Sequence, residues 1–225
     1  MMDTARKAAR LAAALLVLQM FLSPIVNFAL LAPVLAPPGF LKQAPVHATA
    51  VGTAALLGIA IGAMSLGIAI ALWPVIRRHG EAMALWLFGV ALAALVASVV
   101  EQSHVLSMLS LANAHAAASG ADADIFRRLA AQAGAARNTA HYIGLAGGGS
   151  LAFVLYLALY RFALVPRALA GFGIVAALLE IGTVSLPFFG ERIVFPLLAP
   201  LGLAHLALIA WLFARGFADR AAAAA

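Results

Sequence analysis

The chain has 225 residues, of which 65% are hydrophobic and only 10% are charged. A soluble domain of this size could not bury so large an apolar fraction, so the composition indicates a membrane protein. The absence of cysteine excludes disulfides, thiolate metal sites and thiol nucleophiles. The net charge of +6 does not indicate a nucleic acid partner, because the cations gather at the ends of apolar runs, where membrane lipids present their headgroups.

Six apolar stretches reach the roughly 20 residues that a membrane-spanning helix needs. They predict spans over 11–32, 48–73, 82–103, 139–160, 168–189 and 193–214. Most loops between them are too short to hold a second core. The sequence therefore predicts an all-α, polytopic six-helix bundle that forms a single domain over 1–225.

Proline, glycine and arginine mark the ends of these spans. The N-terminal basic residues and the apolar run after them resemble a secretory signal, but the run is too long, so a retained first span is expected. The predicted breaks are Pro33 with Pro37, Pro38 and Gly39; Pro74 with Arg77, Arg78 and Gly80; Arg161 with Pro166 and Arg167; and Gly190, Glu191 and Arg192.

The connection over 104–138 is the one predicted loop with room for structure of its own. Its stretch 122–132 predicts a short amphipathic helix, which Asp122 would cap. This helix would lie either on the outer membrane surface or over the mouth of the bundle, and in both places it is a lid candidate. Its apolar face would consist of Ile125, Phe126 and Leu129.

The distribution of the 14 lysines and arginines predicts the orientation. Cytoplasmic loops carry the excess of positive charge, so the side with more cations is assigned to the cytoplasm. With a cytoplasmic N-terminus, that side holds nine cations: Arg6, Lys7, Arg10, Arg77, Arg78, Arg161, Arg167, Arg215 and Arg220. The outer side then holds five: Lys42, Arg127, Arg128, Arg137 and Arg192. Both termini are therefore predicted to be cytoplasmic.

Two pairs of glycines predict close helix packing. Gly58 with Gly62, and Gly144 with Gly148, each form a GxxxG pair, in which the absence of side chains lets two backbones approach.

Only two acidic residues, Glu101 and Glu180, fall inside the predicted spans. A carboxylate in hydrocarbon costs at least about 2.5–3.5 kcal/mol, so both are functional candidates. At 1.5 Å per residue, Glu101 lies about 30 Å along its helix, and Glu180 and Asn27 lie about 20 and 25 Å along theirs, all in the outer half. We expect one outward-facing polar pocket formed by Asn27, Glu101, His104, Arg137, His141 and Glu180.

Two interpretations of Glu101 stay open. Glu101 and His104 share a helix face, and such an ExxH element occurs twice in di-metal carboxylate bundles but once here, which makes Glu101, His104 and His141 metal candidates. The favoured alternative is an ion pair between Glu101 and Arg137 that joins the third and fourth helices, because pairing lets a charge persist in such a place.

Glu180 has no partner in its own helix. It is therefore protonated, paired with His141 or Arg137, or facing water. His205, about halfway along the sixth span, would extend a proton path inward, unless it only bonds a neighbouring backbone or hydroxyl group. His141 and His205 lie at different depths, so a haem between them would be strongly tilted, and the sequence specifies no cofactor.

The stretch from His141 through the Val165-Pro166-Arg167-Ala-Leu-Ala-Gly-Phe-Gly segment, together with Glu101 and the Arg10-Leu-Ala opening, resembles a bacterial family of six-span membrane proteins known only as a domain of unknown function. Here Leu164 replaces a small polar residue, and Ala170-Gly171 replaces Leu-Gly. The resemblance covers most of the chain and implies a bacterial inner-membrane location without an established activity.

Three functional hypotheses follow. The leading one is the binding or handling of a small molecule, ion or lipid in the outward-facing pocket. The second is an intramembrane metal- or proton-dependent enzyme, although the common hydrolase, nucleotide and dinucleotide motifs do not occur. The third is a structural or regulatory partner without a ligand. Three spans on each side of 104–138 also permit an inverted repeat of the transporter type, but no internal similarity supports it.

Overall fold

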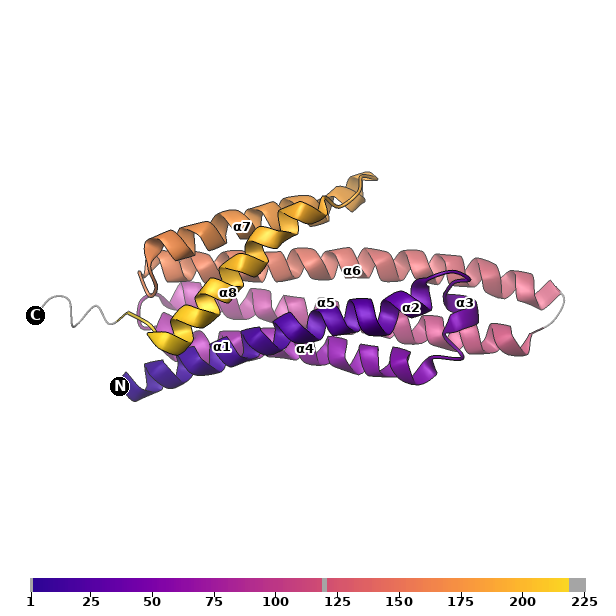
Figure 1. The fold of residues 1–225 in the computed structure, drawn as a ribbon, viewed down its shortest axis with the longest axis horizontal. Coiled ribbons are helices and arrows are strands. Elements are labelled where there is room, and N and C mark those ends of the chain that lie inside the picture. Colours follow the sequence, from indigo (N-terminus) through magenta and orange to yellow (C-terminus); the bar gives the residue numbers. More distant parts are fainter. Residues whose placement is uncertain (1, 119–120, 219–225) are drawn as a thin grey trace, which may run out of the picture. The chain divides into compact units, whose positions relative to one another are not determined.

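The structure is a computed structural model that describes residues 2–118 and 121–218. Within these ranges the chain is helical and contains no strand (Figure 1). The elements are α1 (Met2–Pro24), the π-helix η1 (Ile25–Leu31), α2 (Ala32–Leu35), α3 (Phe40–Gln43), α4 (Ala48–Ile76), α5 (Glu81–Ala117), α6 (Ala121–Arg161), α7 (Arg167–Ser185), the 3-10 helices η2 (Leu186–Phe189) and η3 (Phe195–Leu198), and α8 (Ala199–Ala214).

Six helical segments of the described chain are long and apolar enough to cross a membrane, which confirms the predicted six-span fold class. In hydrocarbon no water can satisfy backbone polar groups, and a helix satisfies them within itself. The segments are Thr4–Leu35, Ala48–Ile76, Glu81–Ala117, Ala123–Arg161, Arg167–Phe189 and Phe195–Ala214. The cytoplasmic placement of both termini stays a prediction.

The first helical segment runs past Pro33, where the predicted break began, and ends at Leu35, just before Pro37, Pro38 and Gly39 of the same predicted break. The helix continues through η1 and α2 to Leu35, and Pro33 lies in the first turn of α2, where a missing N–H leaves no intrahelical bond unmade. Between Pro24 and Pro33 the ladder widens, so that the N–H of Ala32 bonds to the carbonyl of Asn27, five residues earlier. Such π segments are rare, and here the segment lies between two residues that cannot donate.

The predicted loop over 104–138 is also wrong in most of its length. Helix α5 continues to Ala117 and α6 begins at Ala121, so the predicted amphipathic helix is the first part of α6. Asp122, the predicted cap, has a side chain outside the described part. Alanine and leucine are strong helix formers, and polar side chains end a membrane span without ending a helix. With 37 and 41 residues, both helices are nearly twice as long as a span requires.

By its internal contacts the chain divides into two compact units. Unit 1 consists of the described parts of 1–20, 64–94 and 145–225, and unit 2 of those of 21–63 and 95–144. Each unit has an apolar core of its own.

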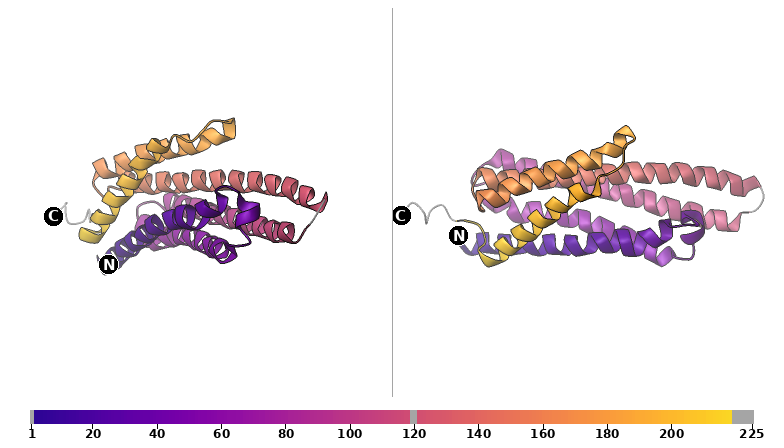
Figure 2. Two further views of the ribbon diagram at one scale, coloured as in Figure 1. Left: turned by 45° about the vertical axis from the view of Figure 1, so that its right-hand side comes forward. Right: turned by 45° about the horizontal axis from the view of Figure 1, so that its top comes forward.

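In unit 1, α6 and α7 pack closely through glycines. The ring of Tyr156 is fully buried and fills the place of a side chain on Gly173, where an added Cβ would lie 2.2 Å from its Cδ1. Two turns earlier in α6, Gly149 lies against Ile181. Figure 2 shows α7 and α8 side by side as a hairpin. The connection between them contains η2 and η3.

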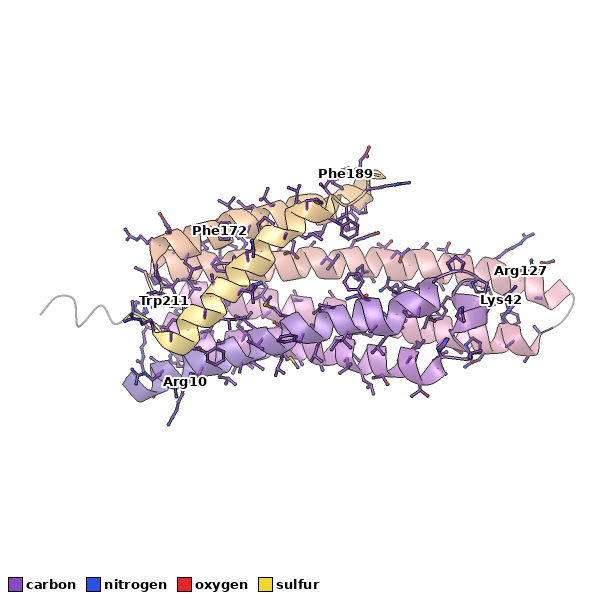
Figure 3. All side chains as sticks on the ribbon, viewed as in Figure 1. Arg10, Lys42, Arg127, Phe172, Phe189 and Trp211 are labelled. Atoms are coloured by element: carbon purple, nitrogen blue, oxygen red, sulfur yellow. The ribbon has the colours of Figure 1, made fainter. Side chains whose placement is uncertain are left out.

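The α7–α8 connection is fastened by Thr183. Its Oγ1 accepts a hydrogen bond from the N–H of Val194 at 2.8 Å and donates one to the carbonyl of Val194 at 3.3 Å. The predicted tight turn at 190–192 thus lies between two 3-10 helices. Phe189 at this end of the hairpin is 81% exposed (Figure 3).

In unit 2, the GxxxG pair of α4 receives two polar side chains of α5. Ser98 lies against Gly62 and donates a hydrogen bond of 2.8 Å to the carbonyl of Gly58, and Gln102 packs on Gly58 itself. The predicted close packing at this pair is confirmed.

The second predicted pair is only half right. Gly144 lies beside Glu101, but a Cβ on Gly148 would meet nothing within 4 Å. Its neighbour Gly147 approaches α5 instead, with 3.7 Å from an added Cβ to the Cα of Ala94. A shift of one residue turns the contact by about 100° around the helix.

Candidate polar site around Glu101

One carboxylate oxygen of Glu101 contacts two basic side chains of α6. The Nη2 of Arg137 donates a hydrogen bond of 3.2 Å to Glu101 Oε1, and the Nδ1 of His141 lies 2.8 Å from the same oxygen. Because an ionised carboxylate only accepts, the imidazole donates from Nδ1 to ionised Glu101. The predicted ion pair between Glu101 and Arg137 is confirmed, and His141 joins it. We call these three residues the Glu101 cluster.

The fold places the Glu101 cluster within unit 2, where the end of α5 runs beside the beginning of α6 (Figure 1). Arg137 and His141 are four residues apart in α6 and therefore share a face. The Arg137 side chain is 9% exposed, that of Glu101 12% and that of His141 23%. Pairing offsets the desolvation of the two charges, and the cluster is most open at His141.

Arg137 keeps hydrogen-bonding capacity beyond this pair. Its Nη1 donates a long bond of 3.4 Å to Oδ1 of Asn138, the next residue. These bonds use two of the five N–H groups of a guanidinium, and the part of the chain that the structure describes offers it no third acceptor. The cluster can therefore donate to a further acceptor.

The second oxygen of Glu101 borders a place without a side chain. A Cβ on Gly144 would lie 3.6 Å from Glu101 Oε2 and within 4 Å of no other non-neighbouring atom. Glycine at this position thus leaves room beside the carboxylate.

Gln102, which the sequence analysis did not single out, is the most buried polar side chain near the cluster. It is 4% exposed, and its Oε1 is buried without a hydrogen-bond partner in the described chain. It faces Gly58 of α4, whereas Glu101 faces α6. A buried amide oxygen without a partner costs about 1–3 kcal/mol. The signal in the sequence that points to this residue is a glutamine next to Glu101 inside an apolar span.

The other candidates of unit 2 do not bond to the Glu101 cluster. The amide of Asn27 donates a hydrogen bond of 3.0 Å to the carbonyl of Ser23 in its own helical segment. His104 is half-buried and makes no hydrogen bond or ion pair with the residues that the structure describes. The described chain also contains no group of three His, Cys, Asp or Glu side chains placed to hold a metal ion.

Glu180 and His205 belong to unit 1. Glu180 is half-buried beside Gly149, and within the described ranges it has neither a hydrogen bond nor an ion pair. The ring of His205 lies on that of Tyr156, with 5.7 Å between centroids, and the buried Tyr156 hydroxyl has no described partner. The shared pocket and the inward proton path stay predictions.

The fold and the site define a multi-pass helical membrane protein with a buried ion-pair cluster between two of its spans. The chain belongs to the family described as Domain of unknown function (DUF4386), whose family model matches residues 11–216. This confirms the resemblance drawn from the sequence. Comparison with curated proteins finds no match, and comparison with solved structures finds none either.

Proposed function

We propose that this protein binds a small molecule or a lipid through an anionic, acceptor-rich group such as a phosphate, at the Glu101 cluster. The observation that carries the proposal is the buried guanidinium of Arg137, which is held by Glu101 and still has N–H groups to donate. We place the protein in the bacterial cytoplasmic membrane, with this site opening outward.

The charges of the cluster support an anionic ligand over a cationic one. Glu101 and Arg137 neutralise each other, so the cluster has no net negative charge that would attract a cation. A phosphate offers acceptors that match the fork of a guanidinium, whereas a metal cation would face Arg137 without offering it an acceptor.

Depth supports a ligand at the membrane boundary. Glu101 follows the first residue of α5 by 20 positions, and His141 precedes the last residue of α6 by 20. About 20 helical residues cross the hydrocarbon, so both side chains would reach the level at which lipid phosphates lie.

A second candidate function is a purely structural clamp between α5 and α6, favoured by the direct bond from Arg137 to Glu101. The two differ in what Arg137→Gln does. Removal of a clamp lowers stability under all conditions, whereas removal of a binding site also abolishes the response to a ligand.

The test measures thermal unfolding of the purified full-length protein with increasing inorganic phosphate at constant ionic strength, and separately in nanodiscs of phosphatidylglycerol or phosphatidylcholine. A ligand that binds only the folded state raises the midpoint. Stabilisation by phosphate indicates a small anion, and stabilisation by phosphatidylglycerol alone indicates a lipid. Whichever response occurs must be reduced in Arg137→Gln and kept in the control Arg127→Gln, an exposed arginine paired with Asp124. A wild-type midpoint that responds to neither supports the clamp and overturns the proposal.

A further inference from the structure

An apolar groove lies between α4 and α5 within unit 1. It has a volume of about 290 Å³ and is lined by Ile70 and Trp73 of α4 and by Leu85 and Phe88 of α5. The two aromatic rings meet edge to face, with 6.3 Å between centroids. Ile70 and Leu85 are 54% and 55% exposed. The groove is therefore open along its length and has an aliphatic residue from each helix at its rim.

The four lining residues all lie in membrane-spanning segments, and none of them carries a charged side chain. In such a segment the surroundings are lipid chains, and the indole N–H of Trp73 is the one hydrogen-bonding group on the four lining side chains. An alkyl chain is the occupant whose chemistry matches this lining.

A cation continues the same face one turn beyond the groove. Ile70, Trp73 and Arg77 follow the i, i+3, i+7 spacing of one helix face. The N–H of Arg77 bonds to the carbonyl of Trp73 at 3.0 Å, so helical geometry extends to Arg77, which is exposed. A guanidinium at the end of a span lies where lipid phosphates are found.

We propose that this groove and Arg77 together bind an anionic phospholipid, with an acyl chain along Trp73 and Phe88 and the phosphate on Arg77. The groove matches an alkyl chain and Arg77 attracts a negative charge, so the two parts together match an anionic phospholipid. On the predicted orientation this lipid belongs to the cytoplasmic leaflet. The site shares no residue with the Glu101 cluster, and the variants at Arg77 and Arg137 separate the two proposals.

Native mass spectrometry of the full-length protein, offered equal amounts of phosphatidylglycerol and phosphatidylcholine with identical chains, tests the charge selection. We expect preferential retention of phosphatidylglycerol, reduced about fivefold in Arg77→Gln, the equivalent of about 1 kcal/mol for one cation near the headgroups. Arg167→Gln, at the end of another span, is the matched control and must keep the preference. Equal retention of both lipids by the wild type, or equal loss in the two variants, overturns the proposal.

A groove-filling variant tests the acyl chain. Leu85→Trp adds bulk at an exposed position, so the protein should fold, and we expect its retained phosphatidylglycerol to fall. Leu178→Trp, at a residue of α7 that is 52% exposed, is the control and must retain wild-type amounts. Wild-type retention by folded Leu85→Trp would show that no chain lies in the groove.

Discussion

The side chain of Gln102 occupies the space that a Cβ on Gly58 would need. An added Cβ would lie 2.5 Å from Gln102 Cδ and 2.6 Å from its Nε2, both far inside contact distance. The adjoining hydrogen bond from Ser98 to the carbonyl of Gly58 fixes the same approach. The spacing of α4 and α5 in unit 2 therefore depends on a residue without a side chain at position 58.

Gly58→Ala is expected to destabilise the protein by about 1–3 kcal/mol, because a methyl group must displace a buried side chain. Reversible unfolding in mixed micelles measures this change. Gly52→Ala in the same helix is the control, since its Cβ would meet nothing within 4 Å, and it should be neutral or slightly stabilising. An equal loss in both variants would refute the steric explanation.

Gln102→Leu tests whether the buried Oε1 of Gln102 accepts a hydrogen bond from a group outside the described chain. If it does not, replacement by an apolar side chain of similar size should be neutral or stabilising, because the desolvated acceptor disappears. We expect this result from the same unfolding measurement. A loss of more than about 2 kcal/mol would instead show that the amide bonds a buried water or ligand.

Glu101 and Arg137 should behave as a coupled pair. Glu101→Gln or Arg137→Gln alone leaves a buried partner uncompensated, which costs about 3–5 kcal/mol, and the double variant should lose clearly less than the sum of the two. The control is Asp124 with Arg127, both 63% exposed, whose separation should cost at most about 1 kcal/mol. Additive losses at Glu101 and Arg137 would contradict the pairing.

Gly173→Ala should be among the most damaging small substitutions in unit 1. Its Cβ would lie 2.2 to 2.4 Å from three atoms of the Tyr156 ring, which is rigid and fully buried. We expect a lower folded yield and a lower thermal midpoint. Gly182→Ala, with open space in the same helix, should resemble the wild type. A wild-type midpoint for Gly173→Ala would place the ring elsewhere.

The absence of cysteine makes the orientation testable with single introduced cysteines. With both termini cytoplasmic, Asn113→Cys and Glu191→Cys should react with an impermeant maleimide on intact cells, and His79→Cys only after permeabilisation. All three positions are exposed, so accessibility does not limit the reaction. Labelling of His79→Cys on intact cells, with Asn113→Cys and Glu191→Cys labelled only after permeabilisation, would instead place both termini outside the cytoplasm.

The six spans could be predicted because hydropathy alone decides them. The pair of Glu101 and Arg137 followed from depth and charge, since a buried carboxylate requires a cation at its own level. The contact of His141 with the same oxygen could not be derived, because it depends on the rotation of α6 against α5. The one-residue difference between Gly147 and Gly148 has the same origin.

Polarity alone does not distinguish a loop from a helix that continues beyond the membrane. The segment 104–138 is polar enough to predict a loop, but its alanines and leucines favour a helix. Gln102 and Tyr156 carry no charge, so the charge pattern of the sequence does not indicate that they are buried. The signal in the sequence that does indicate both is a polar atom inside an apolar span.

The π segment over 25–31 holds one residue more than an α-helix would need between the same two ends. Removing one residue there would restore regular bonding and turn Ser23 and Val34 relative to each other by about 100°. Val34 is 1% exposed in the core of unit 2, so that rotation would carry a core side chain out of its contacts. The extra residue thus sets the rotation of the second part of this span about the helix axis, so that the side chains of both parts face their own contacts.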